Sequence, residues 1–316
     1  MDVRDRTSKL VTVFGGSGFV GRHVVRALAR RGYRVRVAVR NPNLATFLQP
    51  IGGVGQIQAV QANLRFKRSV EAALSGADAV VNLVGILAEG GRQRFPELHA
   101  DGAGLIAHAA PGGIPFVHVS ALGATLHSAS LYAHTKAEGE AAIHTARRDA
   151  VILRPSVMFG QGDTFFNRFA ALARALPVIP LAGAETKFQP VFVGDVAEAV
   201  ARGIDGTIAG GRTYELGGPE TMTLREIVEY VLATTERQRV IVPLPFPVAE
   251  AQARVLSIAD ALTFGIMPDV LKLTRDQVEL LRSDNVVSEA AATEGRDLDG
   301  IGIVPRTIEA IVPSYL

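Results

Sequence analysis

The chain has 316 residues, of which 48% are hydrophobic and 20% charged, and its formal net charge is +2. This composition supplies a large core and excludes an intrinsically disordered chain. The absence of cysteine excludes disulfides and thiolate metal sites, and the 7 histidines lack metal-ligand spacing, so we expect no metal. No basic run alternates with aromatic residues, which argues against nucleic-acid binding.

The start of the chain predicts a strand, a glycine turn and a helix in immediate succession. A β-branched run over residues 11–14 is followed by three glycines spaced three apart and then by apolar residues at helical spacing. Such glycines permit a tight turn, close approach to a phosphate and close helix packing, while the helix N-terminus faces the anion. A purely structural glycine turn is the alternative. The pattern predicts a dinucleotide site that includes Gly15, Ser17, Gly18, Phe19, Gly21 and Arg22.

Strand and helix patterns alternate through the first half, which predicts a parallel sheet covered on both faces. The expected class is therefore α/β with a doubly wound parallel sheet; its Rossmann type and its smaller C-terminal α+β lobe are implied by a family resemblance rather than by this alternation. We expect a dinucleotide-binding domain over 1–155, joined by 187–216, and a lobe over 156–316. Further strands are expected at 34–39, 56–61, 79–84, 115–119 and 150–154, and helices at 68–75, 95–110 and 131–147.

The second half contains more proline and longer loops. Thr223 and Glu226 form a capping box that predicts a helix to about residue 234. Prolines at 243, 245 and 247 predict that 240–249 is extended or turn-like rather than helical. This apolar segment is either a docking surface or a loop packed on its own domain.

The sequence also bears on where the protein resides. The first nine residues are charged and do not resemble a signal peptide, and no apolar run is long enough to span a membrane. We therefore expect a cytoplasmic protein, soluble or peripheral on the inner face of a membrane.

An arginine follows the second predicted strand. NAD-binding folds usually place Asp or Glu at this point to hold the ribose 2′-hydroxyl, whereas Arg40 favours the 2′-phosphate of NADP(H) over NAD(H). Arg22, just inside the first helix, can reach the same phosphate. The alternative is that Arg40 faces solvent.

Short polar or glycine-containing pairs follow the next two strands. Asn63 and Leu64 come after the third strand, where an Asn oxygen and a backbone N–H suit the adenine ring. Val84 and Gly85 end the fourth strand, where glycine permits close backbone approach. Together these strand ends predict one crevice along the carboxyl edge of the sheet.

Tyr132 and Lys136 form a Y-x-x-x-K pattern at the start of a predicted helix. This spacing places both side chains on one helix face. A lysine ammonium lowers the pKa of a nearby phenol, so Tyr132 is a candidate general acid or base. An amphipathic helix that happens to carry both residues is the alternative.

These motifs resemble the extended or atypical short-chain dehydrogenases/reductases. The resemblance rests on GGSGFVG, YAHTK, RPSVMFGQGD at 154–163 and VFVGDVAEAV at 191–200. It implies a Rossmann sheet with a smaller substrate lobe, and it places Pro155, Ser156 and Val157 beside the nicotinamide. We expect Asp195 to cap a helix.

A closer resemblance is to the NADPH-binding accessory subunit of respiratory complex I and its bacterial relatives. It rests on the segments 40–56, 166–181, 187–196 and 243–255. Members of that group resemble enzymes but hold NADPH as a structural ligand. This resemblance implies a nicotinamide dinucleotide and complex I subunits at the membrane surface as partners.

Active relatives carry a Ser or Thr after the fifth strand that hydrogen-bonds the reacting substrate oxygen. The alignment places Ala121 there, and a shift of one residue restores Ser120. Two hypotheses follow. The first is an NADP(H)-binding structural or assembly subunit with weak or no catalysis. The second is an NADPH-dependent oxidoreductase or epimerase that uses Tyr132, Lys136 and Ser120 on a small carbonyl or hydroxyl substrate.

Overall fold

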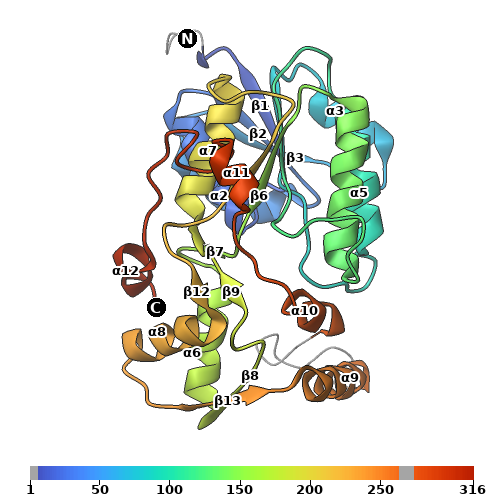
Figure 1. Cartoon of the computed structure of the whole chain (residues 1–316). Coiled ribbons are helices and arrows are strands. Elements are labelled where there is room, and N and C mark those ends of the chain that lie inside the picture. Colours follow the sequence, from blue (N-terminus) through green and yellow to red (C-terminus); the bar gives the residue numbers. More distant parts are fainter. Residues whose placement is uncertain (1–5, 263–273) are drawn as a thin grey trace.

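Seven parallel strands form the central sheet, in the order β11-β6-β5-β4-β1-β2-β3 (Figure 1). The computed structural model describes residues 6–262 and 274–316. The strands are rich in valine and are largely buried, as a sheet covered on both faces requires. They are β1 (Leu10–Phe14), β2 (Arg34–Val39), β3 (Ile57–Gln61), β4 (Ala79–Asn82), β5 (Phe116–Val119), β6 (Val151–Pro155) and β11 (Thr213–Leu216).

Helices cover both faces of this sheet, so the predicted doubly wound α/β fold is confirmed (Figure 1). One face packs against α2 (Phe19–Arg30) and α7 (Val193–Asp205). The other packs against α3 (Lys67–Leu74), α4 (Gly102–Ala109) and α5 (Leu131–Ala146). A 3₁₀ helix, η1 (Pro42–Ile51), follows β2, and a π-helix, η2 (Pro96–Asp101), leads into α4.

The strand order reverses between β1 and β4. From β1 the chain moves outward to β2 and β3, and then returns to β4 on the other side of β1. In open parallel sheets this reversal leaves a crevice at the carboxyl ends of the two strands, where ligands bind. The crevice therefore lies beside the glycine turn that follows β1.

The C-terminal lobe has its own core, centred on Phe159 and Phe166. It includes α6 (Phe165–Ala175), α8 (Leu224–Thr234) and three two-stranded pairs: β7 (Met158–Phe159) with β10 (Val191–Phe192), β8 (Val178–Ala182) with β13 (Val240–Leu244), and β9 (Lys187–Phe188) with β12 (Met222–Thr223). The remaining elements are α9 (Phe246–Leu262), α10 (Arg275–Leu280), α11 (Glu289–Thr293), α12 (Ile308–Ile311) and the 3₁₀ turn Val312–Ser314. Across the described ranges, we find no helix with the length and apolar character needed to cross a membrane.

Three local expectations need correction. β4 ends at Asn82 rather than 84, and the expected helix over 95–110 begins as a π-helix. The capping box at Thr223 is confirmed, but helix α9 begins at Phe246, inside the segment expected to be extended. Pro247 is compatible with this because the first helical turn does not use the missing N–H.

Asp195 does not cap its own helix. The N-cap of α7 is Phe192, so Asp195 lies within the first turn. Its buried carboxylate instead accepts the backbone N–H of Arg306 at 2.8 Å. Asp195 therefore attaches the chain near the C-terminus to α7, a role that depends on a contact far along the sequence.

Candidate functional site

The glycine turn between β1 and α2 is too closely packed for larger residues. Gly15 has a positive φ of 77°, and a Cβ there would lie 3.1 Å from the backbone of Leu83. A Cβ on Gly21 would lie 2.4 Å from the Gly15 oxygen and 2.5 Å from the Gly16 carbonyl carbon. The predicted roles of the first and third glycines, the tight turn and the close helix packing, thus match the geometry.

The N-terminus of α2 is open to an anion. Gly18 is its N-cap, offers no side-chain cap, and is exposed. The first turn, which starts at Phe19, contains no acidic residue. Because the first amides of a helix have no intrahelical partner, a phosphate suits this end. Ser17 is half-buried in the same turn.

Arg22, in the first turn of α2, lies against two segments that are distant in sequence, one containing Gly162 and the other Phe47. A Cβ on Gly162 would lie 3.3 Å from its Nη1, and its guanidinium lies 5.9 Å from the Phe47 ring centroid. Its Nε is buried and has no hydrogen-bond partner. Phe47 belongs to η1, which begins two residues after the exposed Arg40. Arg22 therefore lies in the first turn of α2 against η1, and Arg40 lies in the chain between β2 and η1.

Asn63 and Leu64 follow β3 as expected, but their side chains already contact other parts of the protein. The Asn63 Oδ1 accepts the N–H of Arg65 at 3.1 Å, which leaves one lone pair for a ligand. The Leu64 side chain packs so closely on η2 and α4 that a Cβ on Gly102 would meet it at 2.7 Å.

Val84 and Gly85 follow the carboxyl end of β4, and Gly85 lies close to α5. The Val84 N–H donates to Asn82 Oδ1 at 3.0 Å. A Cβ on Gly85 would lie 3.2 Å from Lys136 Nζ and 3.7 Å from His99 Nε2. Gly85 therefore adjoins the ammonium group predicted to serve the nucleotide, and a larger residue would crowd it.

The structure places Tyr132 and Lys136 on the first turns of α5, as the sequence predicted. The Tyr132 ring contacts Phe95 and His99 edge to face, with centroids 5.8 and 5.4 Å apart. Lys136 is buried, and its Nζ donates to the Val119 carbonyl at 3.3 Å. The structure thus brings the pair to the carboxyl end of β5.

Both ionisation equilibria in this pair are shifted. Burial, with a smaller contribution from the Asp276 charge, raises the pKa of Tyr132 to about 12. Burial lowers the pKa of Lys136 to about 8, against a smaller opposing effect of Glu140. The pKa of Tyr132 is thus raised, whereas the Y-x-x-x-K pattern predicted that Lys136 would lower it.

Ser120 lies at the end of β5 with its hydroxyl buried and without a hydrogen-bond partner. Ala121 follows it and is half-buried. On the neighbouring strand, Pro155 ends β6, and Ser156 donates its hydroxyl to Asn285 Oδ1 at 2.8 Å. Val157 is partly buried and packs on the core of the lobe. The side chain of Asn285 therefore already occupies the polar position beside Ser156.

Sequence reasoning missed four side chains that the structure brings to this region. His99 accepts the N–H of Ile86 at 3.1 Å, and burial, with the nearby Lys136 charge, lowers its pKa to about 3. His118 is fully buried on β5, and burial holds its pKa well below the usual value. Asp276 and Asn285 lie in the C-terminal part of the chain, and no local sequence pattern predicts that they contact this region.

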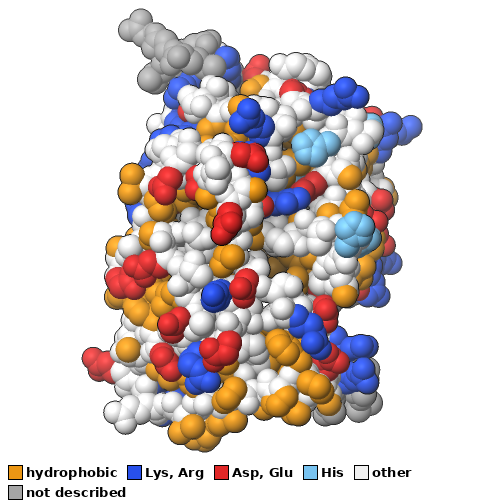
Figure 2. Space-filling view, in the orientation of Figure 1, with side chains coloured by type: hydrophobic (Ala, Val, Ile, Leu, Met, Phe, Trp, Pro, Cys, Tyr) orange, Lys and Arg blue, Asp and Glu red, His pale blue; other side chains and the backbone are white. Residues whose placement is uncertain are grey.

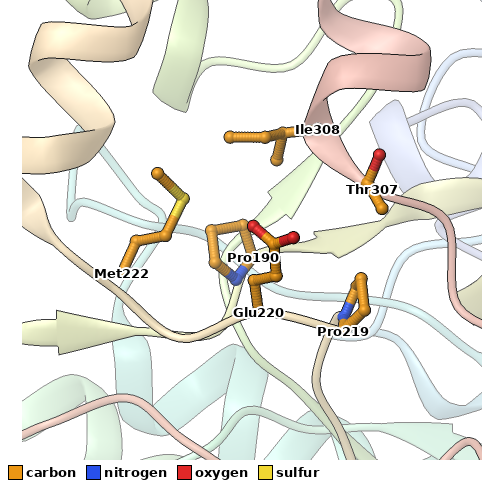
Figure 3. A pocket seen from close by; sticks show the side chains of 6 residues that line it. All are labelled: Pro190, Pro219, Glu220, Met222, Thr307 and Ile308. Carbon is orange, nitrogen blue, oxygen red and sulfur yellow. The ribbon is translucent and has the colours of Figure 1, made fainter.

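Two pockets lie outside the predicted nucleotide site. One, of about 540 Å³, is lined by Arg212, Thr213, Glu294 and Arg296. It lies where β11 starts, opposite the carboxyl ends of the strands. The other lies among the six side chains of Figure 3, where the Glu220 carboxylate lies between Pro190 and Thr307. Its volume of about 10 Å³ admits at most one water, which excludes a substrate site.

A parallel sheet with its strand order reversed beside a glycine turn, and with a Tyr–Lys helix next to it, defines an NAD(P)-binding protein of the extended short-chain dehydrogenase/reductase class. Comparison with known families agrees. The family described as NAD(P)H-binding matches residues 15–167, and the RmlD substrate binding domain matches residues 124–258.

Individual relatives narrow this assignment. NADH dehydrogenase [ubiquinone] 1 alpha subcomplex subunit 9, mitochondrial, of Arabidopsis thaliana is 33% identical over 97% of this chain and 77% of its own length. A ceramide reductase of Caulobacter vibrioides is 30% identical over 90% of this chain and 88% of its own. The NADPH-dependent quinone oxidoreductase QOR2 of Escherichia coli, complexed with NADPH, shares the fold with a TM-score of 0.71 at 20% identity, over 96% of this chain and 98% of its own. The chain belongs to the family of complex I alpha subcomplex subunit 9 within the extended short-chain dehydrogenases/reductases, as the sequence indicated.

We expect the affinity for NADPH to fall as the pH rises through about 8. In this range Lys136 loses its charge, and with it the charge-assisted bond that we expect it to make to the nucleotide. His23 and His99, with pKa values of about 4 and about 3, and Tyr132, at about 12, do not titrate there. Titration calorimetry between pH 7 and 9.5 should show a roughly tenfold weakening. Lys136→Met should bind weakly with no such slope, and an equal slope in this variant would contradict the assignment.

Proposed function

We propose that the protein holds NADP(H) as a structural ligand and associates with respiratory complex I, with weak or no catalysis. The observation that carries this proposal is a contrast within one crevice. The glycine turn packs closely against α2 and leaves the uncapped first amides of that helix available to a diphosphate, whereas burial and Asp276 raise the pKa of Tyr132 above that of an ordinary phenol. A nucleotide is therefore well accommodated, while proton transfer from Tyr132 is disfavoured.

The choice of NADP(H) over NAD(H) rests on two arginines, Arg22 in the first turn of α2 and Arg40 after β2. Arg22 presents a buried guanidinium nitrogen without a partner, and Arg40 is exposed between β2 and η1, the helix whose Phe47 contacts Arg22. A 2′-phosphate would supply the missing acceptor for Arg22 and a charge partner for both. Lys136 would bind the ribose hydroxyls of the nucleotide.

The surface proposed to contact complex I is the β8–β13 pair. These strands pair in parallel but leave Val178, Val240 and Val242 exposed by 42%, 63% and 40%, and Val248 in the adjoining first turn of α9 is exposed by 51%. Figure 2 shows hydrophobic side chains gathered at this end of the molecule. Exposed apolar residues gathered in one place mark an interaction site, and an apolar partner subunit would cover them. We place the protein peripherally, on the inner face of the respiratory membrane.

The test has two parts. The purified protein, denatured in cold methanol, should release about one NADP(H) per chain, identified by mass, and the native protein should co-migrate with complex I. Absence of nucleotide together with migration apart from complex I would overturn the proposal. Steady NADPH consumption with a carbonyl substrate, abolished by Tyr132→Phe, would favour the oxidoreductase instead.

A further inference from the structure

The first turn of α5 is capped by a carboxylate from a distant part of the chain. Asp276, in α10, accepts the Leu131 N–H at 2.6 Å, the Tyr132 N–H at 3.3 Å and the Ser130 hydroxyl at 2.9 Å. Ser130 is the local N-cap and accepts the Ala133 N–H. The carboxylate thus satisfies amides that a helix leaves unpaired and faces the positive end of the helix.

The segment that carries Asp276 also reaches the crevice. We call residues 274–288 the C-terminal strap. Beyond α10, Asn285 Oδ1 accepts the Ser156 hydroxyl at 2.8 Å, beside the position expected for the nicotinamide. Asp284 Oδ1 accepts the Lys187 N–H at 2.9 Å, which fixes the strap to the lobe. The strap therefore bonds to the start of α5, to the end of β6 and to the lobe.

The start of α5 determines where the nucleotide-facing side chains lie. Tyr132 is in the capped turn, and Lys136 is one turn further on. Lys136 has little freedom of its own, because its Nζ is bonded to Val119 beside Gly85. A loosened first turn would therefore displace Tyr132 and disturb the helix backbone from which Lys136 reaches Val119.

We propose that Asp276 is a positioning residue for the nucleotide site, and that docking of the C-terminal strap and tight retention of the nucleotide are a single coupled equilibrium. This inference rests on the proposed function. Coupling of this kind is reciprocal: a strap that holds the nucleotide must itself be held by the nucleotide.

The experiment compares the full chain with Asp276→Ala and Asp276→Asn. Bound NADPH is displaced by excess NADP⁺ and followed by nicotinamide fluorescence, and hydrogen exchange of α5 and the strap is measured by mass spectrometry. Loss of the cap should speed NADPH release by roughly three- to thirtyfold and accelerate exchange of amides 131–136. Asp276→Asn, which keeps one acceptor oxygen, should fall between the other two and guards against a misfolded alanine variant.

Asp284→Asn is the matched control, because it also removes a strap carboxylate, and the Asp284 side chain bonds to Lys187 of the lobe rather than to α5. Its NADPH release rate and α5 exchange should stay within about twofold of wild type. In the wild type, NADPH should slow exchange of residues 275–288, and Asp276→Ala should abolish this protection. NADPH release at the wild-type rate from both folded Asp276 variants overturns the coupling. A wild-type chain that never binds NADPH overturns the proposed function instead.

Discussion

Replacing Gly21 with alanine is expected to abolish nucleotide binding and to destabilise the fold. The added Cβ would lie 2.4 Å from the Gly15 oxygen, so the turn and α2 must separate. Because backbone atoms cannot yield as a flexible side chain can, we expect a loss of about 3 kcal/mol of unfolding free energy. The melting temperature should fall by roughly 5–10 °C, measured by calorimetry.

The control for this variant is Gly112→Ala. Gly112 lies after α4, has no positive φ, and a Cβ there meets nothing within 4 Å. We expect this change to alter stability by less than about 0.5 kcal/mol and to leave NADPH binding intact. A Gly21→Ala chain that binds NADPH as tightly as wild type would refute the assignment of the turn to the diphosphate.

Removing either Arg22 or Arg40 is expected to erase the preference for NADP(H). Arg22→Ala and Arg40→Ala should each weaken NADPH binding by roughly 10- to 100-fold, since a hydrogen bond to a charged group contributes about 1.5–3 kcal/mol. NADH binding should stay within about threefold of wild type. Arg40→Asp should invert the preference, because its carboxylate repels the phosphate and can accept from a ribose hydroxyl.

Arg30→Ala serves as the control for net charge, because Arg30 is exposed in the last turn of α2, at the opposite end from the phosphate site. Calorimetric titration of each variant with NADPH and with NADH measures the ratio directly. If all three alanine variants lose the same amount of affinity, the arginines act only through general attraction, and specific recognition of the 2′-phosphate is refuted.

The strand, turn and helices around the predicted nucleotide crevice are the part of the site that local sequence specified well. The glycine spacing, the valine-rich strands and the Tyr132–Lys136 pair each depend on residues within a few positions of one another. Periodicity therefore carried the information, and the structure shows these residues where they were expected. The sequence analysis missed the start of α9 because the three prolines at 243, 245 and 247 argued against a helix. Pro247, however, lies in the first turn of α9, where a helix accepts proline.

The pKa shifts of Tyr132 and Lys136 could not be predicted from local sequence in the same way. The sequence predicted that Lys136 would make Tyr132 more acidic, but burial and Asp276 act in the opposite direction. Asp276 contacts Tyr132 across 144 positions of sequence. Thr274 and Gln277 form a capping box, a signal that could have located α10, but not its contact with α5.

The sequence by itself determined the α/β class, the order of its elements and a turn shaped for a dinucleotide, because these follow from short-range periodicity and from the few residues that a tight turn accepts. Only the tertiary structure decided which side chains face Tyr132 and Ser156, how deeply Lys136 is buried, and that the β8–β13 valines remain exposed. Burial and distant charge depend on how separate segments meet in space, and no local pattern encodes that meeting.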